Sequence, residues 1–199
     1  AVGRDLARWR AERGPGGPAP FVAVNVSARQ LGSPAYASRF AATLDRHGLR
    51  PRDLVIEFTE DTVIGADRST GRTIDSLHDM GVRLWLDDFG TGYSSLAYLK
   101  RFPMDALKLD RSFVTGLGED HSDTEIVRAV LALGRSLGLS VVAEGVETAQ
   151  QLSLLRDLGC RRAQGFLLGR PGPPDELDRA PRDLPDLTTD PDQQRLPLG

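Results

Sequence analysis

Short apolar runs alternate along the chain with longer segments in which apolar side chains recur every three or four positions. Such runs are typical of buried strands, and the spaced segments are typical of amphipathic helices. The runs predict strands at 21–26, 54–58, 83–86, 106–109, 139–143 and 161–164. The spaced segments predict helices at 4–13, 36–48, 68–80, 96–102, 123–137 and 148–158. Glycines mark the ends of four of these helices: Gly48, Gly81, Gly138 and Gly159.

The predicted order after the first helix is a strand followed by a helix, repeated at intervals of roughly thirty residues. This alternation is the βαβ pattern of a parallel sheet, in which strands are buried on both faces. Both a doubly wound sheet and a (β/α)₈ barrel fit it. The glycine and proline stretch 14–18 ends the first helix. From residue 171 onward the sequence is rich in proline and aspartate and lacks periodicity, so 172–199 is expected to be a tail or linker.

Composition narrows the class of protein. The 25 basic and 28 acidic residues give a net charge of -3, which offers no electrostatic reason to expect a nucleic acid polymer as partner. No apolar run approaches the roughly 18–20 residues that span a membrane, and no signal peptide is visible. Cys160 is the single cysteine, which argues against a disulfide framework and fits a reducing cytoplasm. The chain lacks an initiator methionine and opens inside a helical pattern, so we expect a fragment of a longer protein.

Polar side chains recur at the carboxyl ends of the predicted strands. They are Asn25, Glu57, Asp87 with Asp88, Lys108 with Asp110, Glu144 and Gln164. In a barrel these ends form one face, where active sites are built. So many carboxylates in one cleft would repel one another, and a divalent cation is the natural remedy. Oxygen donors favour Mg²⁺, Mn²⁺ or Ca²⁺ over zinc, and the three histidines are expected on the surface away from strand ends.

Each of these residues also has a bland explanation. A lone Asn25 suits a turn, Lys108 a surface charge, and Asp87-Asp88 a solvated strand-to-helix turn before a glycine loop. Their recurrence at six successive strand ends makes coincidence a poor account of the whole set. Hard cations in a carboxylate ring suit phosphoryl transfer, in which a metal activates water.

Six segments in order resemble the EAL family of cyclic-di-GMP-specific phosphodiesterases. They are NVSARQL (25–31), EFTE (57–60), DDFGTGYSSL (87–96), KLDRSFV (108–114), AEGVET (143–148) and QGF (164–166). The resemblance covers about residues 1–171 and implies an α/β, TIM-barrel-like (β/α)₈ fold, with about six of the eight β/α units present. It implies hydrolysis of one phosphodiester of cyclic di-GMP to give linear pGpG, which lowers the level of this bacterial second messenger.

The resemblance also implies a role for each matching residue. The metal ligands would be Asn25, Glu57, Asp87 and Asp88, with Asp110 supporting the metal site. Glu144 would be the general base or water-positioning carboxylate, and Lys108 would hold the attacking water or a phosphate oxygen. The substrate cleft would include Gln164, Gly165 and Glu147. A regulatory loop that couples dimer contacts to metal binding would include Phe89, Gly90, Thr91 and Gly92, with Glu60 as its anchor.

The implied cofactor is Mg²⁺ or Mn²⁺, as two ions, and the implied assembly is a homodimer in the cytoplasm. Upstream sensor, GGDEF-type or membrane domains would fit the full-length protein. The chain departs from the family by lacking the Glu-Ala-Leu segment, whose glutamate is a metal ligand, and the first two strands. It also has Phe58 and Leu168 where the family usually has Leu or Ile and often an aromatic residue, respectively.

Two other functions stay open at this point. A catalytically inactive member would act as a cyclic di-GMP receptor or a protein-interaction module. A different metal-dependent barrel phosphohydrolase would cleave generic phosphodiesters at comparable rates. Binding of cyclic di-GMP without hydrolysis would distinguish the receptor, and a broad range of substrates would distinguish the general phosphohydrolase.

Overall fold

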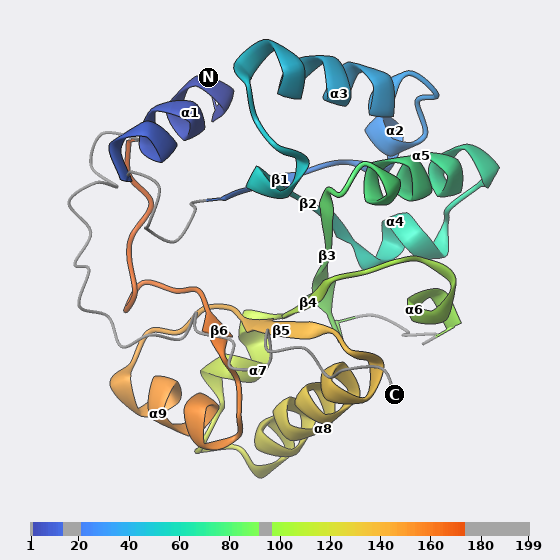
Figure 1. Ribbon diagram of the computed structural model, residues 1–199. Helices are drawn as coiled ribbons and strands as arrows, with labels where there is room; N and C mark the ends of the chain where they lie inside the picture. The colour runs from blue at the N-terminus through green and yellow to red at the C-terminus, as the bar shows by residue number, and fades with distance from the viewer. Residues whose placement is uncertain (1, 14–20, 92–96, 174–199) are drawn as a thin grey trace, which may run out of the picture. The chain divides into compact units, whose positions relative to one another are not determined.

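The computed structural model describes residues 2–13, 21–91 and 97–173, and Figure 1 shows the helices and strands. The predicted stop at 14–18 and the predicted tail beyond residue 173 lie outside the described residues. The chain divides into two compact units, Ala1–Leu107 and Lys108–Gly199, which are described separately below.

The first unit alternates helices and parallel strands. In chain order it contains α1 (Val2–Arg13), β1 (Val22–Asn25), α2 (Ala28–Leu31), α3 (Tyr36–His47), the 3-10 turn η1 (Pro51–Asp53), β2 (Leu54–Thr59), α4 (Glu60–Ile64), α5 (Arg68–Asp79), β3 (Arg83–Phe89) and α6 (Ala97–Arg101). Strand β1 pairs with β2, and β2 pairs with β3, in both cases in parallel. The predicted parallel pairing is therefore confirmed in this unit.

Local chemistry explains where the helices of this unit begin and end. Ser27 and Gln30 form a capping box at the start of α2, and the Asp67 side chain accepts a hydrogen bond from the Thr70 amide at the start of α5. Gly48 ends α3 in the left-handed conformation that glycine adopts at little cost. The short helices α2 and α4 were not predicted, because one turn is too short to show a hydrophobic period.

The helices cover one face of the β1–β3 sheet. A buried cluster joins these helices to the sheet: it contains Leu6 of α1, Leu44 of α3, Leu49 after α3, and Leu54 of β2. Val22 and Val24 of β1 also pack against it. Helix α1 contacts α3, and α3 contacts α5 (Figure 1). Strand β2 is buried along its length except at Thr59, as predicted for a parallel strand. Strand β1 is not, because its residues alternate between half-buried and exposed positions.

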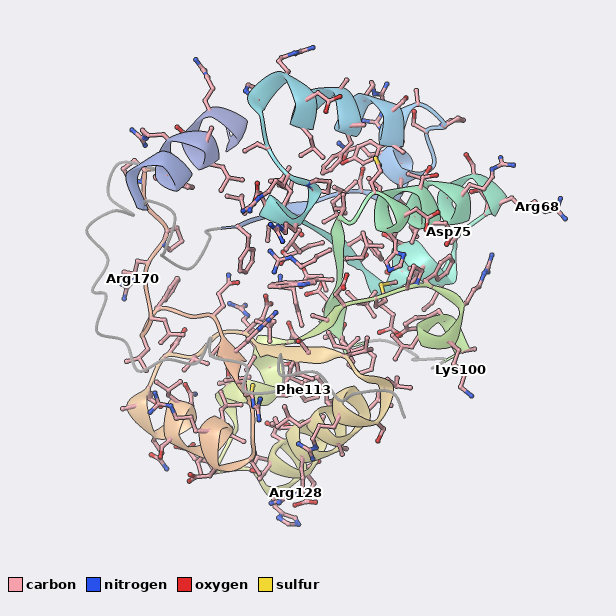
Figure 2. All side chains as sticks on the ribbon, in the orientation of Figure 1. Arg68, Asp75, Lys100, Phe113, Arg128 and Arg170 are labelled. Atoms are coloured by element: carbon pink, nitrogen blue, oxygen red, sulfur yellow. The ribbon has the colours of Figure 1, made fainter. Side chains whose placement is uncertain are left out.

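Polar positions of the outer helices face solvent. Asp75 is exposed on α5, whereas Ile74 and Leu77 on the other side of that helix are fully buried. Figure 2 shows the labelled Arg68 pointing away from the start of α5. His78 and His121 are exposed as predicted, but the ring of His47 is only partly exposed because it lies against Gly3.

Strand β4 (Ala106–Leu109) continues from the first unit into the second. The second unit then contains α7 (Arg111–Thr115), α8 (His121–Leu137), β5 (Ser140–Ala143), α9 (Ala149–Asp157) and β6 (Arg162–Ala163). Strands β5 and β6 pair in parallel. The Asp120 side chain accepts hydrogen bonds from two amides at the start of α8, and Thr148 caps α9.

Helix α8 lies directly on β5 (Figure 1). A side-chain carbon added at Gly134 would approach a methyl group of Val141 to 2.6 Å, so the close packing of helix on strand needs glycine there. Arg128 lies on the opposite side of α8 and points away from it in Figure 2. Its guanidinium pairs with Glu125 at 3.3 Å, and both side chains are more than half exposed.

Most predicted boundaries agree with the structure to within two residues. The largest difference concerns β3, which was predicted to end at Leu86 but extends to Phe89. Helix α8 begins at His121 rather than at Asp123, since Asp120 is the residue that caps it. Helix α7 was not predicted. Among the described helices, none has the length and hydropathy of a membrane span.

Candidate active site

The first unit gathers polar side chains on the face of its sheet that the helices leave uncovered. Asn25 is the register partner of Glu57, and Glu57 is the register partner of Trp85. Partners in parallel strands project to the same face, and so do residues two apart on one strand. Asn25, Glu57 and Asp87 therefore share one face. Glu57 is 5% exposed, whereas Asn25 is exposed at the edge of β1.

Aromatic packing confirms which face this is. Phe21 meets Trp85 edge to face, with ring centroids 5.5 Å apart, and the Arg83 guanidinium lies 4.3 Å from the centroid of the Phe21 ring. Arg83 and Trp85 alternate along β3 with Leu84 and Leu86, which face the helices and are fully buried. The uncovered face thus has a hydrophobic floor of aromatic rings below its polar strand ends.

Asp87 and Asp88 come together through an unusual backbone conformation. Asp87 still belongs to the sheet, where it is the register partner of Thr59, so strand alternation would send Asp88 to the opposite face. Asp88 instead has φ of 56°, the only positive φ among the described non-glycine residues. Its amide donates to Oδ1 of Asp87 at 3.1 Å, and oxygens of the two carboxylates approach within 4.8 Å. The turn brings two carboxylates to one place.

The segment after Asp88 begins as a tight turn. Thr91 donates its hydroxyl to the carbonyl oxygen of Asp88 at 2.9 Å, and Gly90 has φ of 97°. Phe89 is the last residue of β3, and its side chain is buried. The predicted loop residue Gly92 lies outside the described residues.

Glu60 is a buried carboxylate at the first position of α4. It is 5% exposed, and neither of its side-chain oxygens has a hydrogen-bond partner among the described residues. Burying a carboxylate without a partner is costly, so this position is unfavourable for folding alone. The sequence resemblance assigned Glu60 to the anchoring of the regulatory loop.

The second unit brings Lys108 and Glu144 into a close ion pair. The Lys108 Nζ lies 2.7 Å from Oε1 of Glu144, with side-chain exposures of 5% and 18%. The strands set this distance, because the Glu144 amide donates to the carbonyl oxygen of Leu109 at 3.1 Å. Lys108 belongs to the apolar run 106–109 and is buried, which excludes the surface charge that a lone lysine would suggest. Removing one partner of such a pair leaves a buried charge at a cost of about 3–5 kcal/mol.

Asp110 has a structural role that the sequence did not reveal. It is the N-cap of α7, and its Oδ1 accepts hydrogen bonds from the Ser112 amide at 2.9 Å and from the Ser112 hydroxyl at 2.6 Å. Partial burial by itself would raise the pKa of the Asp110 carboxyl, but these hydrogen bonds and the charge of Arg111 outweigh it, so the pKa is lowered. Asp110 is thus held as a carboxylate, with one oxygen committed to the helix.

The predicted substrate-binding residues lie around one backbone junction. The Val146 amide donates to the carbonyl oxygen of Gln164 at 3.0 Å, and the Leu167 amide donates to the Val146 carbonyl at 3.1 Å. A side-chain carbon on Gly165 would come within 2.7 Å of the Val146 carbonyl carbon. Gly165 therefore serves first as the point where two loops touch. The side chains of Gln164 and Glu147 on either side of the junction are exposed.

Sequence reasoning missed two residues beside Glu144. Gly145 has φ of 70°, and a carbon added to it would lie 2.5 Å from Cβ of Arg111. Arg111 is exposed and begins α7. The signal in the sequence was the position of each, directly after the candidate residues Asp110 and Glu144.

Comparison with known protein families matches residues 1–171 to the EAL domain. Two relatives come from Pseudomonas aeruginosa. The bifunctional diguanylate cyclase/cyclic di-GMP phosphodiesterase MucR is 47% identical over 78% of this chain and 23% of its own length. The cyclic di-GMP phosphodiesterase NbdA is 46% identical over 76% of this chain and 19% of its own length. The chain thus spans about a quarter or less of these relatives.

Solved structures show the same fold. A complex of the MucR phosphodiesterase from P. aeruginosa with c-di-GMP has a TM-score of 0.81 at 44% identity, covering 88% of this chain and 70% of that one. The EAL domain of Mycobacterium smegmatis DcpA has a TM-score of 0.82 at 42% identity, covering 89% of this chain and 78% of that one. Klebsiella pneumoniae BlrP1 with manganese and cy-diGMP has a TM-score of 0.74 at 34% identity, covering 84% and 42%. The fold class is therefore α/β and TIM-barrel-like, as predicted, and the described residues contain six of its strands.

Proposed function

Since the chain belongs to the EAL-domain family, we propose that the protein hydrolyses cyclic di-GMP to linear pGpG in a metal-dependent reaction. The observation that carries this proposal is the Lys108–Glu144 ion pair, 2.7 Å long and largely buried at the ends of two strands. A base and a cation fixed in this way suit the attack of water on a phosphodiester. The names of MucR and NbdA support the choice of substrate.

The donor set of the first unit fits hard divalent cations. Asn25, Glu57, Asp87 and Asp88 can each offer a side-chain oxygen as ligand, and oxygens of the last two carboxylates approach within 4.8 Å. Such donors suit Mg²⁺ or Mn²⁺, and we propose that two ions bind, with Asp110 in support. BlrP1 has been solved with calcium and with manganese, each together with cy-diGMP. A bound ion would lower the pKa of its water and polarise the phosphoryl oxygens.

The residues of the second unit would move the proton and orient the reactants. Glu144 would accept the proton of the attacking water as the new oxygen–phosphorus bond forms. The bond from phosphorus to the ribose oxygen would break, and the leaving oxygen would take up a proton from solvent to become a hydroxyl. The Lys108 ammonium, 2.7 Å from Glu144, would orient this carboxylate and stabilise a phosphoryl oxygen. Gln164 and Glu147, both exposed beside the Gly165 junction, would contact the substrate.

We further propose that Glu60 anchors the regulatory loop that includes Phe89, Gly90, Thr91 and Gly92. Its buried carboxylate has unused hydrogen-bonding capacity among the described residues, which is the support for this role. A homodimer, a cytoplasmic location, and sensor, GGDEF-type or membrane domains in the full-length protein complete the proposal. MucR, whose name includes a diguanylate cyclase activity, is a precedent for such a combination.

Turnover of cyclic di-GMP by the full-length protein tests the function. The assay resolves cyclic di-GMP from pGpG by chromatography, with Mg²⁺, with Mn²⁺ and with excess chelator. We expect pGpG in both metals and none in chelator. Activity that persists in chelator would contradict the role of the metal. Binding without turnover would favour a receptor, and equal turnover of bis(p-nitrophenyl) phosphate would favour a general phosphohydrolase.

A further inference from the structure

Arg111 lies beside the strand end that carries Glu144. It is the first residue of α7 and follows Leu109, the last residue of β4, by two positions. The carbonyl oxygen of Leu109 accepts a hydrogen bond from the Glu144 amide at 3.1 Å. The backbone thus places the start of α7 next to the Glu144–Gly145 step. This neighbourhood comes from hydrogen bonding within the second unit alone.

The stem of Arg111 occupies the space where Gly145 lacks a side chain. A carbon added to Gly145 would lie 2.5 Å from Cβ, 3.3 Å from Cα and 3.7 Å from Cγ of Arg111. Gly145 also has φ of 70°, which disfavours any other residue. The positive φ and the lack of space for a side chain both favour glycine at position 145. Because Gly145 has no side chain, the first carbons of Arg111 can lie against it.

Arg111 forms no ion pair in the described part of the second unit, and its charge acts on the neighbouring Asp110 only at longer range. Two other arginines of the chain do form ion pairs. Arg50 pairs with the buried Asp53 at 2.8 Å, and Arg128 pairs with Glu125 at 3.3 Å. Lys108, the nearest other cation of the strand ends, is already held by Glu144.

Two carboxylates lie near Arg111: Asp110 precedes it in sequence, and Glu144 precedes Gly145, the residue beside the Arg111 stem. Oδ1 of Asp110 accepts from Ser112, and Glu144 pairs with Lys108. An anionic substrate approaching this edge would meet net negative charge unless a cation is exposed there. Arg111 is the exposed cation that begins α7.

We propose that Arg111 binds a phosphate of the substrate next to the Glu144–Lys108 pair, an inference that rests on the proposed function. Cyclic di-GMP carries one negative charge on each of its two phosphodiesters. A guanidinium can hold two oxygens of such a group with two parallel hydrogen bonds, which an ammonium cannot do with the same geometry. Arg111 is then a substrate-binding residue, and Gly145 is the position that lets its stem reach the site.

The test compares three variants of the full-length protein. Arg111→Met keeps the stem over Gly145 and removes the charge, whereas Arg111→Lys keeps the charge. Arg128→Met is the matched control, because it removes an exposed arginine on the solvent side of α8. We expect Arg111→Met to raise KM for cyclic di-GMP about tenfold, with kcat changed less than about threefold, as for the loss of one charge-assisted hydrogen bond at a partly solvated site. Arg111→Lys should raise KM less, and Arg128→Met should match the wild type.

The salt dependence of KM separates binding from a structural effect. KM of the wild type should rise with ionic strength more steeply than KM of Arg111→Met, because the variant lacks one ionic contact. Equal salt dependence, or a KM of Arg111→Met within twofold of the wild type, would overturn the inference. If the wild type neither binds nor hydrolyses cyclic di-GMP, the proposed function itself fails. If the wild type is active and Arg111→Met is unaffected, only the inference about Arg111 fails.

Discussion

The contact between Gly165 and the Val146 backbone allows a quantitative prediction. An added carbon at Gly165 would lie 2.7 Å from the Val146 carbonyl carbon and closer still to its nitrogen and oxygen. Ordinary contacts begin near 3.4 Å, so the Gly165→Ala variant must separate the two backbones by several tenths of an ångström or more. The obstacle is main chain, which cannot rotate away as the end of a flexible side chain can.

The separation acts on both stability and catalysis. Two hydrogen bonds flank the contact, from Val146 to Gln164 at 3.0 Å and from Leu167 to Val146 at 3.1 Å. Overpacking costs about 1–3 kcal/mol, and each of the two weakened hydrogen bonds adds up to about 1 kcal/mol, so the free energy of unfolding should fall by about 1–5 kcal/mol. Val146 follows Glu144 by two residues. Displacement of a catalytic group by about 1 Å can cost roughly hundredfold, so kcat/KM should fall about 10- to 100-fold.

Urea denaturation and cyclic di-GMP turnover measure the two effects in Gly165→Ala. Gly169→Ala is the matched control, because no atom lies within 4 Å of its added carbon and its backbone is outside the positive-φ region. The control should stay within about 0.5 kcal/mol of the wild type and keep its activity. A Gly165→Ala variant that is as stable and as active as Gly169→Ala would refute the steric argument.

Three further predictions concern single residues. Because Asp88 has φ of 56°, Asp88→Ala should be less stable than Asp88→Gly by about 1 kcal/mol in urea denaturation, and both should bind Mn²⁺ more weakly; equal stabilities would contradict the strain. Asp110→Ala should lose about 1 kcal/mol through the missing cap of α7. The pKa of Asp110 in the native protein lies below its ordinary 3.8, so the stability difference between the wild type and Asp110→Ala should persist at neutral pH and disappear as pH falls through the native pKa, below about pH 4. A stability difference that stays constant down to about pH 2 would contradict this prediction. Burial raises the pKa of the Cys160 thiol, so iodoacetamide should label the native protein on the order of a hundredfold more slowly than the urea-unfolded protein, and equal rates would contradict the burial.

Much of the fold followed from the sequence, because local patterns and tertiary packing agree. The run Leu54–Phe58 is apolar enough to be a buried strand, and it is one. Gly48 and Gly138 end their helices in the left-handed conformation, as glycine at such positions suggests. The buried surroundings of Lys108 were also visible in its apolar neighbours.

Other features depend on contacts between distant segments and left no local pattern. The positive φ of Asp88 occurs inside the last residues of β3, whereas the sequence predicts that this strand ends at Leu86. The pairing of Gly165 with Val146 joins residues nineteen positions apart in sequence. The use of Asp110 as a helix cap required α7, which is one turn long and has no hydrophobic period.

The most direct test of the account is the Glu144→Gln variant of the full-length protein, assayed for turnover and for binding of cyclic di-GMP with Mg²⁺ and Mn²⁺. Glutamine keeps an oxygen that can accept from the Lys108 ammonium, now 2.7 Å from Glu144, but it cannot take a proton from water. We expect kcat to fall at least about 10²- to 10⁴-fold while Kd for cyclic di-GMP changes only a few-fold. Turnover at the wild-type rate would contradict the assignment of Glu144 as the base.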